Sequence, residues 1–193
     1  MKTRNAWLAL VVLLVVHGSA RSDFIATATL TGDGESPSTG TGYGTVTFNT
    51  AADTLTVALA FTGLESPTAI PAGVPGAAHI HFGLPGVEGP IIFPFIEPYA
   101  NNFPLGVTSG TYVTTLTAAS LTPDSADGIN TFAEAVSAIE AGQTYFNIHT
   151  VAFPGGEIRG QITVVPEPAS LALLTLGLGG ILAIARFRRR LAA

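Results

Sequence analysis

The stretches YFNIHT (residues 145–150) and GEIRGQI (residues 156–162), near the C-terminal end of the chain, decide its fold. In both stretches apolar and polar residues alternate, so side chains of one kind lie on the same side of an extended backbone. A period of two is typical of strands that bury one face. The residues between the two stretches include Pro154-Gly155, which favours a turn. The sequence therefore predicts a β-hairpin with one apolar face.

The second face of this hairpin is expected to be polar. In a symmetric hairpin the facing pairs are His149 with Glu157, Asn147 with Arg159, and Tyr145 with Gln161. Cross-strand neighbours on one face are close enough to hydrogen-bond. We expect a hydrogen bond between His149 and Glu157. We also expect a structural polar face formed by Asn147, Glu157, Arg159 and Gln161.

A second alternating stretch, AAHIHFG (residues 77–83), places His79 and His81 on one face of a strand. With His149 they are the only histidines after residue 17. The first interpretation is structural: these imidazoles hydrogen-bond to Glu157, Asn147 or the backbone across the sheet, and the domain has no cofactor. The alternative is a mononuclear copper or zinc site, because imidazole suits both metals and His149 completes a set of three if the two strands are neighbours.

Two ordered blocks, AAHIHFG…GVEGPII and YFNIHT…PGGEIRGQI, resemble the CHRD domain, a family named after repeats in chordin. The resemblance covers residues 24–164. It implies an extracellular all-β domain and says little about activity.

Further strands are predicted at residues 24–31, 43–49, 54–61, 90–95 and 110–117, with one short helix at residues 131–141. Pro90 and Pro94 confine the 90–95 segment to a sheet edge or to a short piece of strand. We therefore predict a mainly β fold, an antiparallel β-sandwich or Greek-key barrel with one short helix. Targeting segments flank it on both sides.

Charge and composition exclude several functional classes. The chain has no cysteine, which removes disulfides, thiolate catalysis and thiolate metal sites. All 13 acidic residues lie between residues 23 and 167, whereas Arg159 is the only basic residue between residues 22 and 185. Nucleic acid is excluded as a partner, because its binding needs many Lys and Arg side chains. A lone Arg in so acidic a domain is expected to pair with a carboxylate.

The N-terminal segment has the pattern of a secretory signal peptide. It combines a basic start, an apolar run at residues 6–16 and small residues before residue 21. We assign residues 1–22 to the signal peptide and residues 23–165 to the CHRD-like β domain.

Residues 166–193 have a tripartite pattern. The motif Pro166-Glu167-Pro168 precedes an apolar run at residues 169–185, and the arginines that follow are Arg186, Arg188, Arg189 and Arg190. This ending resembles the PEP-CTERM sorting signal of Gram-negative bacteria. The resemblance implies recognition by an exosortase, with transient anchoring in the inner membrane through a transmembrane helix before processing. The alternative is a plain C-terminal anchor.

From the sequence we expect an exported, non-enzymatic module at the cell surface or in the extracellular matrix. It would have a binding or structural role, with an extracellular polysaccharide or a surface protein as partner. The alternative function is mononuclear copper or zinc binding by the three histidines. No arrangement of catalytic residues can be argued from the sequence.

Overall fold

The computed structural model describes residues 22–32 and 36–166. Within these residues the chain forms eight strands, one α-helix, α1 (Phe132–Glu140), and one 3-10 helix, η1 (Ala118–Ser120). The strands are β1 (Phe24–Thr31), β2 (Thr41–Asn49), β3 (Thr54–Thr62), β4 (Ala78–Phe82), β5 (Ile91–Pro94), β6 (Gly110–Leu116), β7 (Thr144–Ile148) and β8 (Ile158–Val164). Every strand and the helix lie where the sequence predicts them.

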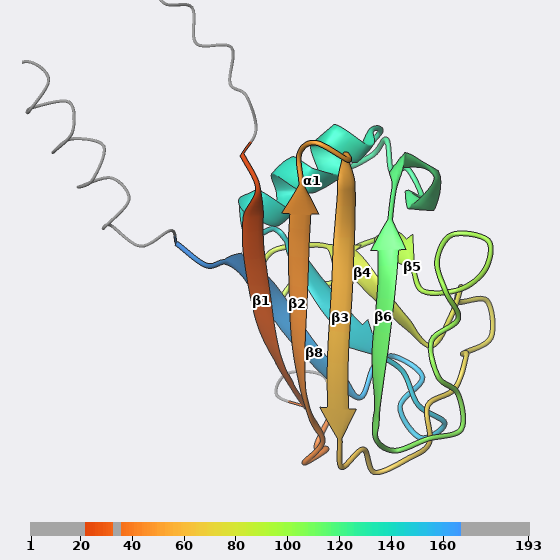
Figure 1. Ribbon diagram of the computed structural model, residues 1–193. Coiled ribbons are helices and arrows are strands. Elements are labelled where there is room, and N and C mark those ends of the chain that lie inside the picture. The colour runs from red at the N-terminus through yellow and green to blue at the C-terminus, as the bar shows by residue number, and fades with distance from the viewer. Residues whose placement is uncertain (1–21, 33–35, 167–193) are drawn as a thin grey trace, which may run out of the picture.

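All eight strands form one antiparallel sheet in the order β5-β4-β7-β8-β1-β2-β3-β6. The sheet curls around the core, so β4, β5 and β8 lie behind β2, β3 and β6 (Figure 1). The two ends of the sheet meet across the core, where the rings of Phe95 and Tyr112 lie 5.0 Å apart. The structure confirms the predicted mainly β, antiparallel fold, in the form of a nearly closed barrel. It also confirms β5 as an edge strand.

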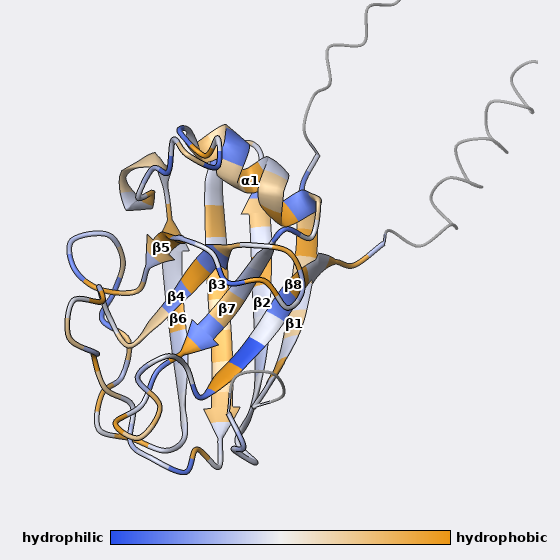
Figure 2. Ribbon diagram, turned by 180° about the vertical axis from the view of Figure 1, so that it is seen from behind, coloured by the Kyte–Doolittle hydropathy of each residue, from blue (hydrophilic) through white to orange (hydrophobic). Residues whose placement is uncertain are grey.

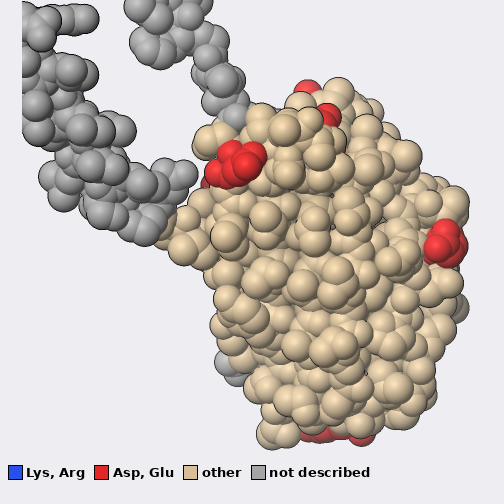
Figure 3. Space-filling model, viewed as in Figure 1, with Lys and Arg blue, Asp and Glu red and all other residues tan. Residues whose placement is uncertain are grey.

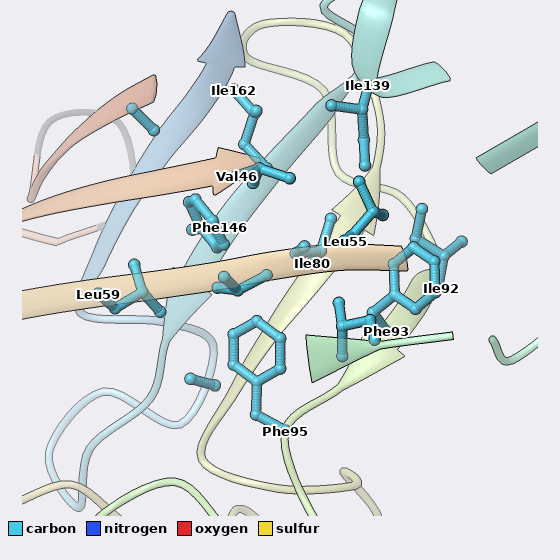
Figure 4. Close-up of a cluster of buried hydrophobic side chains, with 14 of the residues drawn as sticks. Val46, Leu55, Leu59, Ile80, Ile92, Phe93, Phe95, Ile139, Phe146 and Ile162 are labelled. Carbon is cyan, nitrogen blue, oxygen red and sulfur yellow. The ribbon is translucent and has the colours of Figure 1, made fainter. Parts of the chain in front are cut away.

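The barrel is filled by one cluster of apolar side chains that every strand helps to form (Figure 4). Among its fully buried members are Leu55, Ile80, Phe93 and Phe146. Phe146 reaches the opposite side of the barrel at Gly44, where an added Cβ would come within 2.6 Å of the Phe146 ring. Glycine at position 44 therefore makes room for this aromatic side chain.

Helix α1 covers one end of the barrel (Figure 1). Thr131 caps its N-terminus in a capping box with Glu134, which satisfies backbone N–H groups that the helix leaves unpaired. Gly142, with φ of +68°, follows the helix and leads the chain into β7. The helix thus orders the chain immediately before the hairpin that the sequence identified.

The outer face of β1, β2, β3 and β6 carries no charge. These four strands contain no Asp, Glu, Lys or Arg, and threonine dominates their outward positions. Figure 3 shows this face, with acidic side chains only near its margins. Tyr43 and Val113 add exposed apolar surface, with 52% and 61% of their surface accessible. This uncharged face of four strands is called the threonine face below.

The corresponding face of β4, β7 and β8 is viewed in Figure 2, where a loop crosses part of it. Residues 83–89 bond to the hairpin, with the Gly83 N–H donating to the Gln143 carbonyl at 2.8 Å. The loop before β4 also bonds to the hairpin, because the Ala69 N–H donates to the His149 carbonyl at 3.2 Å. All five residues of β7 are consequently buried. On the polar face of the hairpin, Tyr145 and Asn147 are thus buried, whereas Arg159 and Gln161 are half-buried.

Candidate functional site

The three histidines are brought together by the pairing of β4 with β7. In that antiparallel pair His79 lies opposite Asn147, and His81 lies opposite Tyr145. His149 follows β7 directly, and its backbone N–H donates to the Ala77 carbonyl at 2.8 Å. The strand that carries His79 and His81 is therefore the neighbour of the hairpin that carries His149, as a shared site requires. All three side chains are buried, and one nitrogen of each lies within 4.8 Å of the others.

Each imidazole is oriented by a backbone carbonyl. His79 Nε2 lies 3.0 Å from the Gly76 carbonyl oxygen and His81 Nδ1 lies 2.8 Å from that of Gly89. His149 Nδ1 lies 2.9 Å from the carbonyl oxygen of Pro154. A carbonyl can only accept, so each of these three nitrogens carries the proton. In the neutral imidazole the opposite nitrogen is then a lone pair, and all three tautomers are fixed.

The three remaining nitrogens face one another. His79 Nδ1 and His149 Nε2 are 3.2 Å apart, although the carbonyl contacts leave a lone pair on each. His81 Nε2 is buried without a hydrogen-bond partner among the described residues. A proton on one imidazole can join His79 to His149, but it leaves His81 Nε2 unsatisfied. A metal ion accepts all three lone pairs at once, because neutral imidazole nitrogen is a common metal ligand.

Burial keeps two of these imidazoles neutral. Desolvation, with smaller contributions from the neighbouring His149 and His81, lowers the pKa of His79 to about 3. Desolvation also lowers the pKa of His81 to about 4, against the opposing effect of its bond to the Gly89 carbonyl. Both groups are therefore uncharged and able to act as ligands at neutral pH.

A stack of side chains supports His81 from the hairpin. The rings of His81 and Tyr145 are parallel within 7° and 4.8 Å apart. The Arg159 guanidinium carbon lies 3.7 Å from the centre of the Tyr145 ring on β7. Arg159 Nη2 also donates to the Val87 carbonyl at 2.8 Å, and the Gly89 N–H donates to the Tyr145 hydroxyl at 3.2 Å. The stack therefore holds the loop whose carbonyl fixes the tautomer of His81.

Two more members of the expected polar face also secure loops. Gln161 Nε2 donates to the carbonyls of Gly83 and Gly142 at 2.9 and 2.7 Å. Asn147 Nδ2 donates to the Gly155 carbonyl at 3.1 Å, next to the residue that orients His149. The cross-strand pairs of Asn147 with Arg159 and of Tyr145 with Gln161 occur as predicted.

The predicted hydrogen bond between His149 and Glu157 is wrong. Both ring nitrogens of His149 face other groups, as described above, and Glu157 is a fully buried carboxylate with partners of its own. Its oxygens accept from Ser38 Oγ and Thr150 Oγ1, both at 2.7 Å, and from the Glu65 N–H at 2.6 Å. Glu157 therefore ties loops together, while the imidazoles of His79 and His149 face each other.

Other expectations are not tested by these contacts. The described partners of Arg159 are the Val87 carbonyl and the Tyr145 ring, so its pairing with a carboxylate stays a prediction. Residues 167–193, with the predicted transmembrane helix and the C-terminal arginines, lie outside the described residues, as do residues 1–21 of the predicted signal peptide. No helix among the described residues is long and apolar enough to cross a membrane.

Sequence reasoning missed the second layer of the site. Tyr145 was placed on the correct face, but nothing in the sequence marked it as the neighbour of His81. The sequence also could not predict which backbone carbonyls contact the imidazoles, namely those of Gly76, Gly89 and Pro154. Every residue has a carbonyl, and the loop conformation alone sets its direction. The register of β4 against β7 would have been needed to find Tyr145.

Comparison with known proteins agrees with this picture of an exported β domain. Residues 26–162 match the CHRD domain, which includes the three histidines, Tyr145 and Arg159. Residues 164–190 match the PEP-CTERM protein-sorting motif, which marks an exported protein that an exosortase recognises. Neither is an enzyme family. No curated protein and no solved structure matches the chain. The chain belongs to the CHRD domain family and ends in a PEP-CTERM sorting motif.

Proposed function

We propose that the domain is an exported, non-enzymatic module that binds one copper or zinc ion through His79, His81 and His149. The observation that carries this proposal is the convergence of three buried imidazole nitrogens whose opposite nitrogens all face backbone carbonyls. Such a carbonyl contact is the usual second layer of a metal-binding histidine, because it fixes the tautomer and the ring orientation.

The spacing of the nitrogens suits a first-row transition metal. An ion about 2.0–2.1 Å from each nitrogen in tetrahedral geometry holds its ligands about 3.4 Å apart. His79 Nδ1 and His149 Nε2 are already at 3.2 Å, and the largest separation in the set is within 4.8 Å. Small movements of His81 bring all three nitrogens to one ion. Imidazole ligands without thiolates or carboxylates suit copper and zinc better than calcium or magnesium.

Burial favours retention of the ion over turnover of a substrate. His79, His81 and His149 expose 0%, 8% and 4% of their surfaces, so an ion between them lies beneath the loops. The proposed role is therefore to hold a metal ion at the cell surface or in the extracellular matrix, for storage, protection or structural support.

Metal analysis of the full-length protein tests this function. After loading with copper or zinc and removal of free metal, we expect about one equivalent of ion per chain by elemental mass spectrometry. His81→Ala removes a ligand and is expected to abolish retention. His17→Ala, in the N-terminal segment, is the matched control and keeps the wild-type stoichiometry. Wild-type protein without bound metal at neutral pH contradicts the proposal.

The threonine face favours a second function, docking onto a neutral extracellular polysaccharide. Hydroxyl groups donate and accept hydrogen bonds, and a surface without charges requires no counterions to be displaced from an uncharged partner. Tyr43 adds one exposed ring on which a sugar can stack. An uncharged, hydroxyl-rich polymer is therefore the partner that this surface fits.

Sedimentation of the protein with insoluble cellulose tests this second function. Thr47→Lys and Thr56→Lys place charge on the threonine face, where the two residues are cross-strand neighbours. The double variant is expected to lose co-sedimentation. Ala126→Lys, at an exposed position in the loop before α1, adds charge away from this face and is the control. If all variants bind cellulose equally, the threonine face is not its binding surface. If the wild-type protein does not bind, cellulose is not a partner.

A further inference from the structure

The ligand set of this site has a property that separates copper from zinc, namely its charge. Resting on the metal-binding function proposed above, we infer that the site selects monovalent copper, Cu(I), over divalent ions. Three features of the site favour Cu(I): the charge of the ligands, the number of ligands and the enclosure of the site.

The ligands contribute no negative charge. Among the residues that the structure describes, the cluster consists of three imidazoles, and no carboxylate or thiolate joins it. The buried carboxylate of Glu157 directs its oxygens to Ser38, Thr150 and the Glu65 N–H. Among the described residues, no ligand therefore neutralises the charge of a bound ion.

That charge is costly to bury, and the cost rises with its square. The desolvation penalty of one unit charge in a protein is already several kcal/mol after relaxation, and a divalent ion pays the larger cost unless an anionic ligand offsets it. The Arg159 guanidinium, one ring beyond His81 in the stack, adds positive charge on the same side. Both features weaken the binding of Zn(II) and Cu(II) more than that of Cu(I).

The number of ligands points to the same ion. Zinc in proteins is almost always four-coordinate, so three histidines leave it in need of water or an anion. Cu(I), with a filled d shell, is stable with three nitrogen ligands in a plane. The three histidines are nearly inaccessible to solvent, which limits the supply of a fourth ligand. A three-coordinate ion fits an enclosed set of three imidazoles.

The test loads metal-free, full-length protein separately with Cu(I) under anaerobic reducing conditions, with Cu(II) and with Zn(II). Competition with bathocuproine disulfonate for Cu(I), and with EDTA for the divalent ions, gives the three dissociation constants. We expect Cu(I) to bind at least about 100-fold more tightly than Zn(II), which corresponds to about 2.7 kcal/mol. X-ray absorption of the copper-loaded protein is expected to show three-coordinate Cu(I) with nitrogen ligands.

The outcomes separate the two proposals. If none of the three ions binds, the metal-binding function itself is overturned. If Zn(II) or Cu(II) binds as tightly as Cu(I), and His81→Ala abolishes that binding, the three-histidine site stands and the selection of Cu(I) is overturned.

Arg159→Gln supplies a further test of the charge argument. It removes the cation beside the stack and keeps the three histidines, but it also removes the hydrogen bond to the Val87 carbonyl. A looser loop affects both ions alike, so the ratio of their dissociation constants reports the charge. We expect the variant to retain one equivalent of Cu(I). We also expect the ratio of the Zn(II) to the Cu(I) dissociation constant to fall at least threefold, which corresponds to about 0.7 kcal/mol. An unchanged or wider preference contradicts the electrostatic part of the argument. His17→Ala is the matched control and leaves all three constants unchanged.

Discussion

Replacing Arg159 by Ala tests how the covering loop is held over the site. The change removes a cation–π contact at 3.7 Å from the Tyr145 ring centre and a hydrogen bond of 2.8 Å to the Val87 carbonyl. The first is worth about 0.5–2 kcal/mol and the second, from a charged donor, about 1.5–3 kcal/mol when buried. Arg159 is half-buried, so we take the lower part of each range and expect a loss of about 2 kcal/mol in the free energy of unfolding.

Urea denaturation of the metal-free protein, followed by circular dichroism, measures this loss. Arg159→Lys keeps the charge but lacks the planar fork, so it is expected to recover about half of the lost free energy. In the metal-loaded protein, Arg159→Ala is also expected to speed the release of metal to a chelator, because the loop that carries the Gly89 carbonyl is held less firmly. If Arg159→Ala unfolds at the wild-type urea midpoint, the stack contributes nothing and this reasoning is refuted.

Three further predictions concern protonation, packing and processing. Because burial lowers the pKa of His79 and His81 to about 3 and 4, the unfolded chain binds more protons below pH 6.5. The free energy of unfolding of the metal-free protein should be at its full value above pH 6.5 and should fall by up to about 2.7 kcal/mol per pH unit between pH 6 and 4. Urea midpoints that do not change over this pH range would contradict the prediction. Gly44→Ala should cost about 1–3 kcal/mol in thermal unfolding through overpacking, whereas Gly155→Ala, which meets nothing within 4 Å, should be nearly neutral. Intact mass of protein from its native host should show loss of residues 169–193, and a mature pool that retains them would argue for a plain anchor.

The sequence by itself determined the local structure. Alternation with a period of two located β3, β4 and both strands of the final hairpin, because a strand with one buried face must alternate. Helical spacing and the glycine after it located α1. Symmetric pairing about the turn was assumed for the hairpin, and it gave the pairing of Asn147 with Arg159 that the structure shows.

Tertiary structure alone decided what the polar face does. The alternation pattern cannot distinguish a solvent-exposed polar face from one that loops cover, because the two give the same sequence. Here residues 83–89 and the loop before β4 cover β7, so His79, His81 and His149 become buried groups with fixed tautomers.

The fate of Glu157 shows the same limit. Cross-strand proximity suggested His149 as the partner of Glu157. Its carboxylate instead accepts hydrogen bonds from Ser38 and from the Glu65 N–H, which are 119 and 92 residues away along the chain. A hydrogen bond depends on where a backbone N–H or hydroxyl lies in space, and loop conformation sets that position. The sequence therefore determined which residues share a face, and the packing of the loops onto that face decided that three imidazole lone pairs point at one another.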